Sequence, residues 1–185
     1  MTTHTDNWQE AAVLIPLYHN KDGKLTLLLA RRTEGGMHGG QIAFPGGKRE
    51  PGDTSLAETA LRETAEEIGL SPANVHIVTQ LPVQETRTTR FRVHPFLGYI
   101  SVLPANLSRS EREIAEILHV QVSTLTRPEA EGVVWMDFAT WDEPRQVPCY
   151  FAGEYPVWGL TYRILRQFLP RLLAGEWPEL TERRG

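Results

Sequence analysis

Three glutamates, Glu63, Glu66 and Glu67, stand at spacings of three and four residues, which place side chains on one face of a helix. Like charges this close destabilise a helix unless a cation lies among them. Carboxylate oxygens in a cluster are hard ligands that suit Mg²⁺ or Mn²⁺. Gly46 and Gly47 lie upstream, and glycine lets the backbone approach a ligand closely. These residues predict a site where a divalent metal ion meets phosphate groups.

The glutamates need a helix to present them, and the surrounding residues supply its signals. Ser55 and Glu58 form a capping-box pattern at its start, and Gly69 is suited to end it in a left-handed conformation. An apolar stripe at helical spacing is expected to pack on a sheet, while the glutamates face a cleft. The stripe consists of Ala57, Leu61, Ala65 and Ile68.

The rest of the chain reads as strands around two helices. A hairpin is predicted over 11–31, with its turn at Asn20–Gly23, and an amphipathic helix over 158–173, which Pro170 bends or breaks. Further strands are expected at 41–44, 75–80, 91–100, 114–122 and 133–137. This pattern predicts one domain over residues 1–185, of α/β (α+β) class, with a mixed central sheet between helices. Residues 1–10 and 177–185 are expected to be flexible ends.

Composition limits the classes of function. The chain has 185 residues and a formal net charge of −4, and this acidity argues against a nucleic-acid partner, which needs a basic face. The single cysteine, Cys149, excludes an internal disulfide and a cysteine-based zinc cluster. No apolar run is long enough to span a membrane, and residues 1–10 lack the apolar core of a secretion signal. A cytoplasmic protein with a small-molecule partner is therefore expected.

The acidic segment resembles the box of the Nudix hydrolases, G-x5-E-x7-R-E-U-x-E-E-x-G-U, where U is apolar. Gly47 matches its first glycine, and residues 62–70, Arg-Glu-Thr-Ala-Glu-Glu-Ile-Gly-Leu, match its second half. This chain departs from the box in three ways. The spacing from Gly47 to Arg62 is one residue longer, Asp53 replaces the first glutamate, and Thr64 replaces an apolar residue.

The longer spacing and the aspartate resemble the coenzyme A pyrophosphatase branch of that family. Its upstream signature, L-L-T-x-R-S-x3-R-x3-G-x3-F-P-G-G, is similar to residues 27–47, although Leu29, Arg32 and Gly36 replace its threonine, its serine and its second arginine. Residues 91–98, 106–118 and the Trp-Gly-Leu-Thr at 158–161 are also similar to that branch. The resemblance thus covers most of the chain and implies the α/β/α sandwich of the family.

The resemblance also implies roles for individual residues. Glu63 and Glu67 would be the firmest metal ligands, with Glu66 and the Gly46 carbonyl beside them. Arg62 is read as an orienting residue that pairs with a carboxylate, for instance Glu58 four residues earlier. The general base would be a box glutamate, Glu113 or Glu116, with Glu113 favoured. The substrate would contact Arg31, Arg32, Gly46 and Gly47.

The implied activity is metal-dependent hydrolysis of a diphosphate linkage in a nucleoside diphosphate derivative. Coenzyme A or a derivative is the expected substrate, which gives adenosine 3',5'-bisphosphate and 4'-phosphopantetheine. The loss of the second arginine at Gly36 keeps other substrates open, namely ADP-ribose, a dinucleotide or a nucleotide triphosphate. A non-catalytic nucleotide-binding module is a further alternative, which the intact glutamates argue against. Many relatives are dimers, so a homodimer also stays open.

Overall fold

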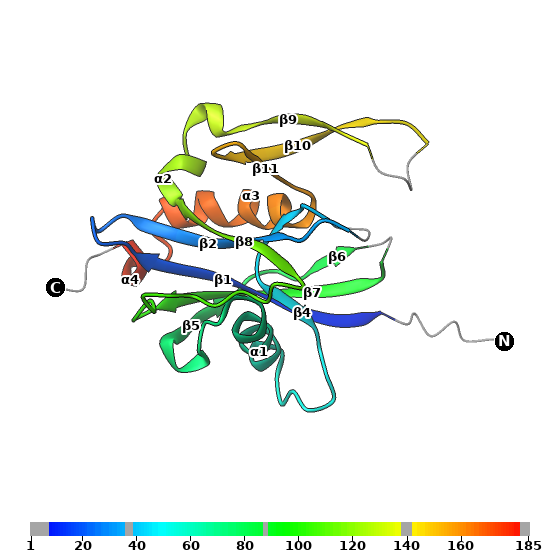
Figure 1. The fold of residues 1–185 in the computed structure, drawn as a ribbon. Helices are drawn as coiled ribbons and strands as arrows, with labels where there is room; N and C mark the ends of the chain where they lie inside the picture. Colours follow the sequence, from blue (N-terminus) through cyan, green and yellow to red (C-terminus); the bar gives the residue numbers. More distant parts are fainter. Residues whose placement is uncertain (1–7, 36–38, 87–88, 138–141, 182–185) are drawn as a thin grey trace.

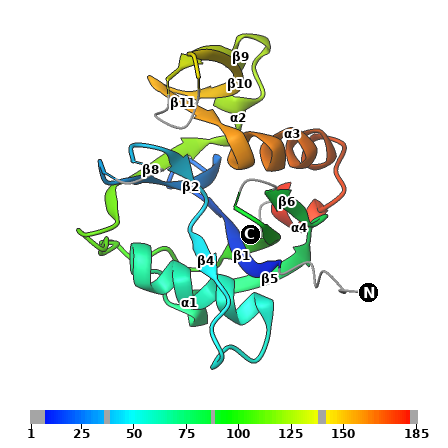
Figure 2. The same cartoon turned by 90° about the vertical axis from the view of Figure 1, so that its right-hand side faces the viewer.

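The computed structural model describes residues 8–35, 39–86, 89–137 and 142–181. Within them, the strands form an eight-stranded mixed sheet and a three-stranded antiparallel sheet. Helices α1 (Leu56–Ile68) and α3 (Gly159–Leu173) cover opposite faces of the large sheet (Figures 1 and 2). The predicted mixed sheet between helices is therefore confirmed.

The large sheet is organised around two long strands that run parallel, β1 (Gln9–His19) and β7 (Phe91–Ile100). Strand β2 (Leu25–Arg32) returns antiparallel to β1, as the predicted hairpin requires. The other strands pair antiparallel with these three; they are β3 (Ile42–Ala43), β4 (Gly46–Lys48), β5 (Val75–Gln80), β6 (Gln84–Thr86) and β8 (Ile114–Gln121).

Strand β1 shows how the core lies on both faces of this sheet. Successive side chains of a strand point to opposite faces, so Leu14 packs with Ala60 of α1, while Ile15 and Leu17 pack with the group that contains Phe168 of α3. Because helices cover both faces, β1 reads as a continuous apolar run rather than an alternating one.

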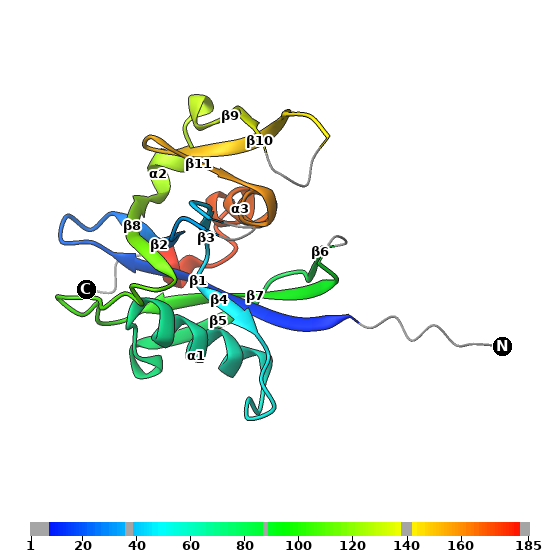
Figure 3. The ribbon, with the colours of Figure 1, turned by 45° about the vertical axis from the view of Figure 1, so that its right-hand side comes forward.

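The three-stranded sheet is a layer that the sequence only partly indicated. It contains β9 (Glu131–Met136), β10 (Arg145–Ala152) and β11 (Tyr155–Trp158), and it lies on the side of α3 away from the large sheet (Figure 3). Of these strands, only β9 was expected. Tyr150 of β10 packs against Tyr162 of α3, with 5.3 Å between the ring centroids and the rings tilted by 41°, so tertiary packing supports this layer.

Helix α1 has the expected ends. The Ser55 side chain accepts a bond from the Glu58 N–H at 3.1 Å, and Gly69 ends the helix with a left-handed φ of 69°. The Glu58 carboxylate accepts from the Thr54 N–H at 2.6 Å, so the returning arm of the capping box reaches one residue further upstream than the usual pattern.

The predicted separation of an apolar stripe from a glutamate face is wrong for Glu67. The buried side chains of α1 include Ala60, Thr64, Glu67 and Ile68, whereas Leu61 is only partly buried. Helix α1 packs on both β1 and β4, and β4 covers the turn that carries Glu67. Thr64 tolerates this burial because its hydroxyl donates to the Ala60 carbonyl at 2.6 Å.

The C-terminal region also differs from expectation in two places. Helix α3 continues through Pro170 to Leu173, so the proline does not break it. Trp177 and Leu180 are buried and pack in the main core, and Leu180 lies in the short helix α4 (Pro178–Thr181). The part of the expected flexible end at 177–181 therefore packs on the domain, while residues 182–185 lie outside the described residues.

Short helical turns connect the strands. They are η1 (Pro72–Asn74), α2 (Val122–Leu125) and η2 (Pro128–Ala130). In the described part of the chain, no helix has the length and apolar character needed to cross a membrane.

The cap at Gly69 yields a first prediction. A Cβ at this residue would lie 2.2 Å from the Ser108 hydroxyl oxygen, and the left-handed conformation disfavours any side chain. We expect Gly69→Ala to lower the free energy of unfolding by about 1 kcal/mol or more in urea titrations. Gly52→Ala is the control, because a Cβ there meets nothing within 4 Å. Equal stability of the two variants would contradict the role of Gly69 as a left-handed cap of α1.

Candidate active site

The glycine turn and helix α1 meet at a buried carboxylate. Glu67 is only 4% exposed, and its Oε2 accepts a hydrogen bond from the Gly46 backbone N–H at 3.1 Å. Its Oε1 lies 3.7 Å from Nη1 of Arg32 on β2. A helix, a strand and a turn from separate parts of the chain thus converge on one side chain.

Burial of the Glu63 and Glu67 carboxylates favours a bound positive charge beside them. It raises the pKa of Glu67 to about 7, although the Gly46 bond and Arg32 act in the opposite direction. Burial also raises the pKa of Glu63, against the effect of Arg62. A carboxylate that has lost its water gains more than an exposed one from a nearby cation. These two glutamates therefore suit a bound cation better than a solvated helix face would.

A side chain at residue 47 would collide with Glu63. A Cβ on Gly47 would lie 2.5 Å from the Glu63 carboxylate carbon, which is closer than atoms can approach. Glycine here thus lets the Glu63 carboxylate lie directly against the backbone of β4. From the sequence we expected the backbone at this turn to approach a ligand closely. In the structure the backbone approaches the Glu63 side chain of α1 instead.

Arg62 organises the loop before the helix. Its Nε donates to Asp53 Oδ1 at 2.9 Å and its Nη2 to Asp53 Oδ2 at 3.1 Å, a two-point pairing that arginine makes well. Asp53 is buried and also accepts from the Glu50 N–H and the Thr59 hydroxyl. Asp53 therefore takes the place of the first box glutamate as the partner of the arginine.

The predicted partner of Arg62 was wrong. Glu58 instead accepts from Thr54, while Arg62 Nη1 lies 3.1 Å from Glu63 and 3.2 Å from Glu66. Spacing allowed either choice, but the loop brings Asp53 to the side of the helix where Arg62 lies. In this arrangement the guanidinium group neutralises part of the glutamate cluster.

The donor set fits a hard divalent ion, although these side chains are not arranged around one. Oxygen atoms of Glu63, Glu66 and Glu67 are the only acidic donors on this face of α1 among the described residues, and oxygen donors suit Mg²⁺ and Mn²⁺. Across the described ranges, no three Asp, Glu, His or Cys side chains are grouped so as to hold a metal ion. Glu63 and Glu66 are instead paired with Arg62.

The two candidate bases differ in their surroundings. Glu116 on β8 accepts from Arg31 Nε at 3.3 Å and from the Tyr155 hydroxyl at 2.9 Å. Glu113 is exposed, and its charge contributes to the raised pKa values of both Glu63 and Glu67. The charge of Glu113 thus acts on the cluster, whereas the carboxylate of Glu116 is held by Arg31 and Tyr155.

A β-bulge separates the two neighbouring arginines. The register between β2 and β8 shifts between Arg31 and Arg32, and bulges re-aim side chains. Arg31 joins Glu116 and lies 5.6 Å from the Tyr155 ring centroid, while Arg32 joins Glu67. The structure thus places Arg32 beside the glutamates but engages Arg31 elsewhere. Gly36, at the position of the branch's second arginine, lies outside the described residues.

A large cleft adjoins the glycine turn. It has a volume of about 910 Å³ and is lined by Arg32, Gly46 and Gly47 on one side and by the start of α3 on another. Lining residues that the sequence analysis did not select include Phe91, Trp158, Thr161, Arg163 and Arg166. The similarity of residues 91–98 and 158–161 to the coenzyme A pyrophosphatase branch was a signal for Phe91, Trp158 and Thr161. For Arg163 and Arg166 the signal was their spacing, which places both on one face of the expected helix.

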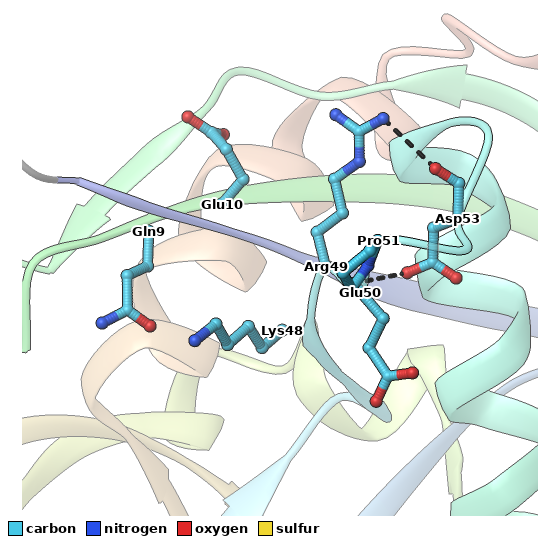
Figure 4. Close-up of a pocket in the computed structure, with 7 residues that line it drawn as sticks. All are labelled: Gln9, Glu10, Lys48, Arg49, Glu50, Pro51 and Asp53. Carbon is cyan, nitrogen blue, oxygen red and sulfur yellow. Dashed lines mark hydrogen bonds between the residues drawn. The ribbon is translucent and has the colours of Figure 1, made fainter.

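A smaller pocket of about 320 Å³ lies where the start of β1 meets the loop after β4 (Figure 4). Lys48, Arg49 and Glu50 contribute to its lining, and Arg49 donates to the Asp53 carbonyl at 3.2 Å. Lys48 lines both this pocket and the cleft, so the two openings are neighbours.

The Asp53–Arg62 pair predicts a dependence of stability on pH. Bonds from Arg62 hold the pKa of Asp53 well below its ordinary value, so the unfolded chain binds this proton more readily than the folded one. The stabilisation is complete above pH of about 4 and is lost as the pH falls further. We expect Asp53→Asn to be less stable than the parent at pH 7, with a smaller difference at pH 3.

Urea unfolding at both pH values measures this effect. Glu50→Gln is the matched control, because Glu50 is exposed and 4.0 Å from Arg62, and we expect little change in it. If the difference in unfolding free energy between Asp53→Asn and the parent stayed constant down to pH 3, the Asp53–Arg62 pairing would be contradicted.

Comparison with known proteins agrees with this arrangement. Residues 8–147 match the model of the NUDIX domain family. The chain is 35% identical over 164 residues to the Nudix hydrolase NudL of Yersinia enterocolitica, covering 87% of this chain and 80% of that protein. It is 34% identical to NudL of Photorhabdus laumondii, covering 88% and 84%.

Solved structures show the same fold at lower sequence identity. The Nudix hydrolase RenU of M. Smegmatis aligns with a TM-score of 0.61 at 16% identity, covering 90% of this chain and 86% of that one. A MutT/nudix family protein of Enterococcus faecalis aligns with a TM-score of 0.61 at 17% identity, covering 94% and 65%. Because the family domain matches most of the chain, this protein belongs to the Nudix family and is a pyrophosphohydrolase of nucleoside diphosphate derivatives.

Proposed function

We propose that the enzyme hydrolyses the diphosphate linkage of coenzyme A or its derivatives, with Mg²⁺ or Mn²⁺ as the metal. The products would be adenosine 3',5'-bisphosphate and 4'-phosphopantetheine. The upstream signature of the coenzyme A pyrophosphatase branch supports this substrate, as do the residues around Trp158, which line the cleft.

The observation that carries the proposal is the size and lining of the cleft. Its volume of about 910 Å³ is at the upper end of ordinary ligand pockets, which suits a long substrate. Apolar side chains such as Phe44 and Phe91 line part of it, and basic side chains line other parts. A substrate with charged phosphates and a largely uncharged arm matches this mixed surface.

Glu63, Glu66 and Glu67 would hold the metal, with the Gly46 carbonyl as an additional ligand. The bound ion supplies neutralisation of the diphosphate charge and activation of water. Holding it requires Glu63 and Glu66 to turn away from Arg62, which both now contact. Arg62 remains tied to Asp53 through two bonds, so it keeps its place when those contacts loosen.

The remaining residues orient the substrate and move a proton. Arg32 and the β4 backbone at Gly46 and Gly47 lie where the cleft meets Glu67, which suits binding of the diphosphate. In the proposed reaction, a water oxygen attacks phosphorus, the bridging P–O bond breaks and the water proton passes to Glu113. The exposure of Glu113 and its influence on Glu63 and Glu67 support this role better than the engaged Glu116 does.

Turnover across a set of diphosphates tests the substrate. Coenzyme A, ADP-ribose, a dinucleotide and a nucleotide triphosphate would be compared at equal concentration with Mg²⁺ or Mn²⁺. We expect the highest kcat/KM for coenzyme A and no turnover with a chelator. A higher value for any other member of the set would assign the enzyme to that substrate instead.

Glu67→Gln tests the metal role. The variant keeps the shape of the side chain but loses the ligand charge, so we expect kcat to fall by about a hundredfold or more while the fold is retained. Mg²⁺ or Mn²⁺ should raise the Tm of the parent but not that of the variant. Glu143→Gln, at an exposed position, is the charge-matched control; parent-like turnover of Glu67→Gln would remove Glu67 from the site.

Variants at Glu113 and Glu116 test the base. We expect Glu113→Gln to lose about a hundredfold in kcat, with a metal-induced rise in Tm close to that of the parent. Glu116→Gln should retain most of its turnover, because Glu116 is bound to Arg31 and Tyr155. The reverse order of activities would give the role to Glu116, and two fully active variants would exclude both.

A further inference from the structure

The wall of the cleft formed by α3 carries two arginines that the chemistry at the glutamates does not use. Arg163 and Arg166 are three residues apart and both line the cleft, so they share one face of α3. They lie after residue 147, where the match to the NUDIX domain model ends. This wall therefore lies beyond the part of the chain that matches the family domain, and it borders the same cleft.

Neither arginine is neutralised by a carboxylate. Within the described ranges, no carboxylate oxygen lies within 4.0 Å of either guanidinium group. Glu85 is the acidic residue among those that line the cleft. Its carboxylate accepts from Arg92 Nε at 3.4 Å. Arg163 Nη2 donates to the Glu85 backbone carbonyl at 3.2 Å, and Arg166 hydrogen-bonds with Tyr162. In contrast, Arg32 and Arg62 are paired with glutamates.

The backbone adds to this positive wall. Gly159, Leu160 and Thr161 form the first turn of α3 and line the cleft. No side chain caps this helix start, and first-turn N–H groups lack partners within a helix. The N-terminal end of a helix carries partial positive charge that favours anions. Two arginines without a carboxylate partner and a helix start thus line one cleft.

The cleft also has an apolar lining. Phe91 and Val93 of β7 and Phe44 line the cleft together with the two basic regions. A ligand that extends along the cleft would meet one anion-binding region at Arg32 and Gly46 and another at α3. A guanidinium group matches phosphate oxygens in two-point geometry, so the second region suits a phosphate rather than an uncharged group.

We propose that Arg163 and Arg166 form a second phosphate subsite, which binds a phosphomonoester on the nucleoside part of the substrate while the glycine turn receives the diphosphate. This inference rests on the proposed function, because the adenosine of coenzyme A carries such a group at its 3' position. It assigns to α3 the discrimination between substrates with and without that phosphate.

Binding of two nucleotides tests the subsite without any turnover. Calorimetry would compare adenosine 3',5'-bisphosphate with adenosine 5'-monophosphate, which differ only in the 3'-phosphate. We expect the parent to bind the bisphosphate about tenfold or more tightly. Arg163→Gln, Arg166→Gln and the double variant should reduce this ratio stepwise toward one, and the corresponding lysine variants should restore part of it.

Arg127→Gln is the matched control, because it removes one exposed positive charge outside the cleft; its binding ratio should equal that of the parent. Arg163 and Arg166 are themselves exposed, so we expect the variants to fold, which thermal unfolding would check. Equal affinity of the parent for both nucleotides, or an unchanged ratio in the double variant, would overturn the subsite.

Turnover separates the two proposals. The ratio of kcat/KM for coenzyme A to that for 3'-dephospho-coenzyme A should fall about tenfold in Arg166→Gln. If the parent discriminates between the nucleotides but hydrolyses neither coenzyme, the subsite stands and the proposed substrate fails. If it hydrolyses both coenzymes equally and does not discriminate, the proposed reaction stands and the subsite fails.

Discussion

The burial of the Glu67 carboxylate is the constraint on which the site depends. Removing a carboxylate from water is costly unless hydrogen bonds and opposite charge compensate. Here the Gly46 N–H and Arg32 provide partial compensation, and the pKa of Glu67 stays raised. Helix α1 must therefore lie against β4, and β4 must carry glycines at this point. A bound cation would relieve the remaining cost, so the fold prepares the carboxylate for its proposed ligand.

Arg62 stabilises both the loop before α1 and the glutamate cluster on α1. By pairing with the buried Asp53 it fixes the loop that leads from β4 into α1, and by contacting Glu63 and Glu66 it reduces the repulsion among the glutamates. The longer spacing of the box is accommodated in this loop, while Asp53 supplies the carboxylate. The departures from the family pattern therefore leave the ion pair in place.

The cleft combines the glutamates and the glycine turn with a wall formed by the start of α3. The glycine turn and glutamates belong to the region that matches the family domain, whereas α3 follows that region. Substrate choice in a common fold depends on such added surfaces rather than on the fold. In the proposed enzyme, the glutamates would perform the chemistry and α3 would contribute to recognition, so the two tasks would rest on separate residues.

Local patterns in the sequence were sufficient for the hairpin, the ends of α1 and the clustering of its glutamates, because turns, caps and helical spacing depend on nearby residues. The strands β10 and β11 had no comparable local signal, and their layer is supported by contacts with α3. The partner of Arg62 was also open, since spacing alone cannot rank Asp53 against Glu58. The path of the loop before α1 brings Asp53, and not Glu58, within hydrogen-bond distance of Arg62.

The same reasoning applies to the functional residues. Residue types and spacing predicted an acidic metal-phosphate site at Glu63, Glu66 and Glu67. They could not show that Glu67 is buried, that Glu116 is bound to an arginine 85 residues away, or that α3 forms a wall of the cleft. Burial and long-range pairing arise only when distant segments pack together, and so these properties belong to the folded chain and not to any single stretch of it.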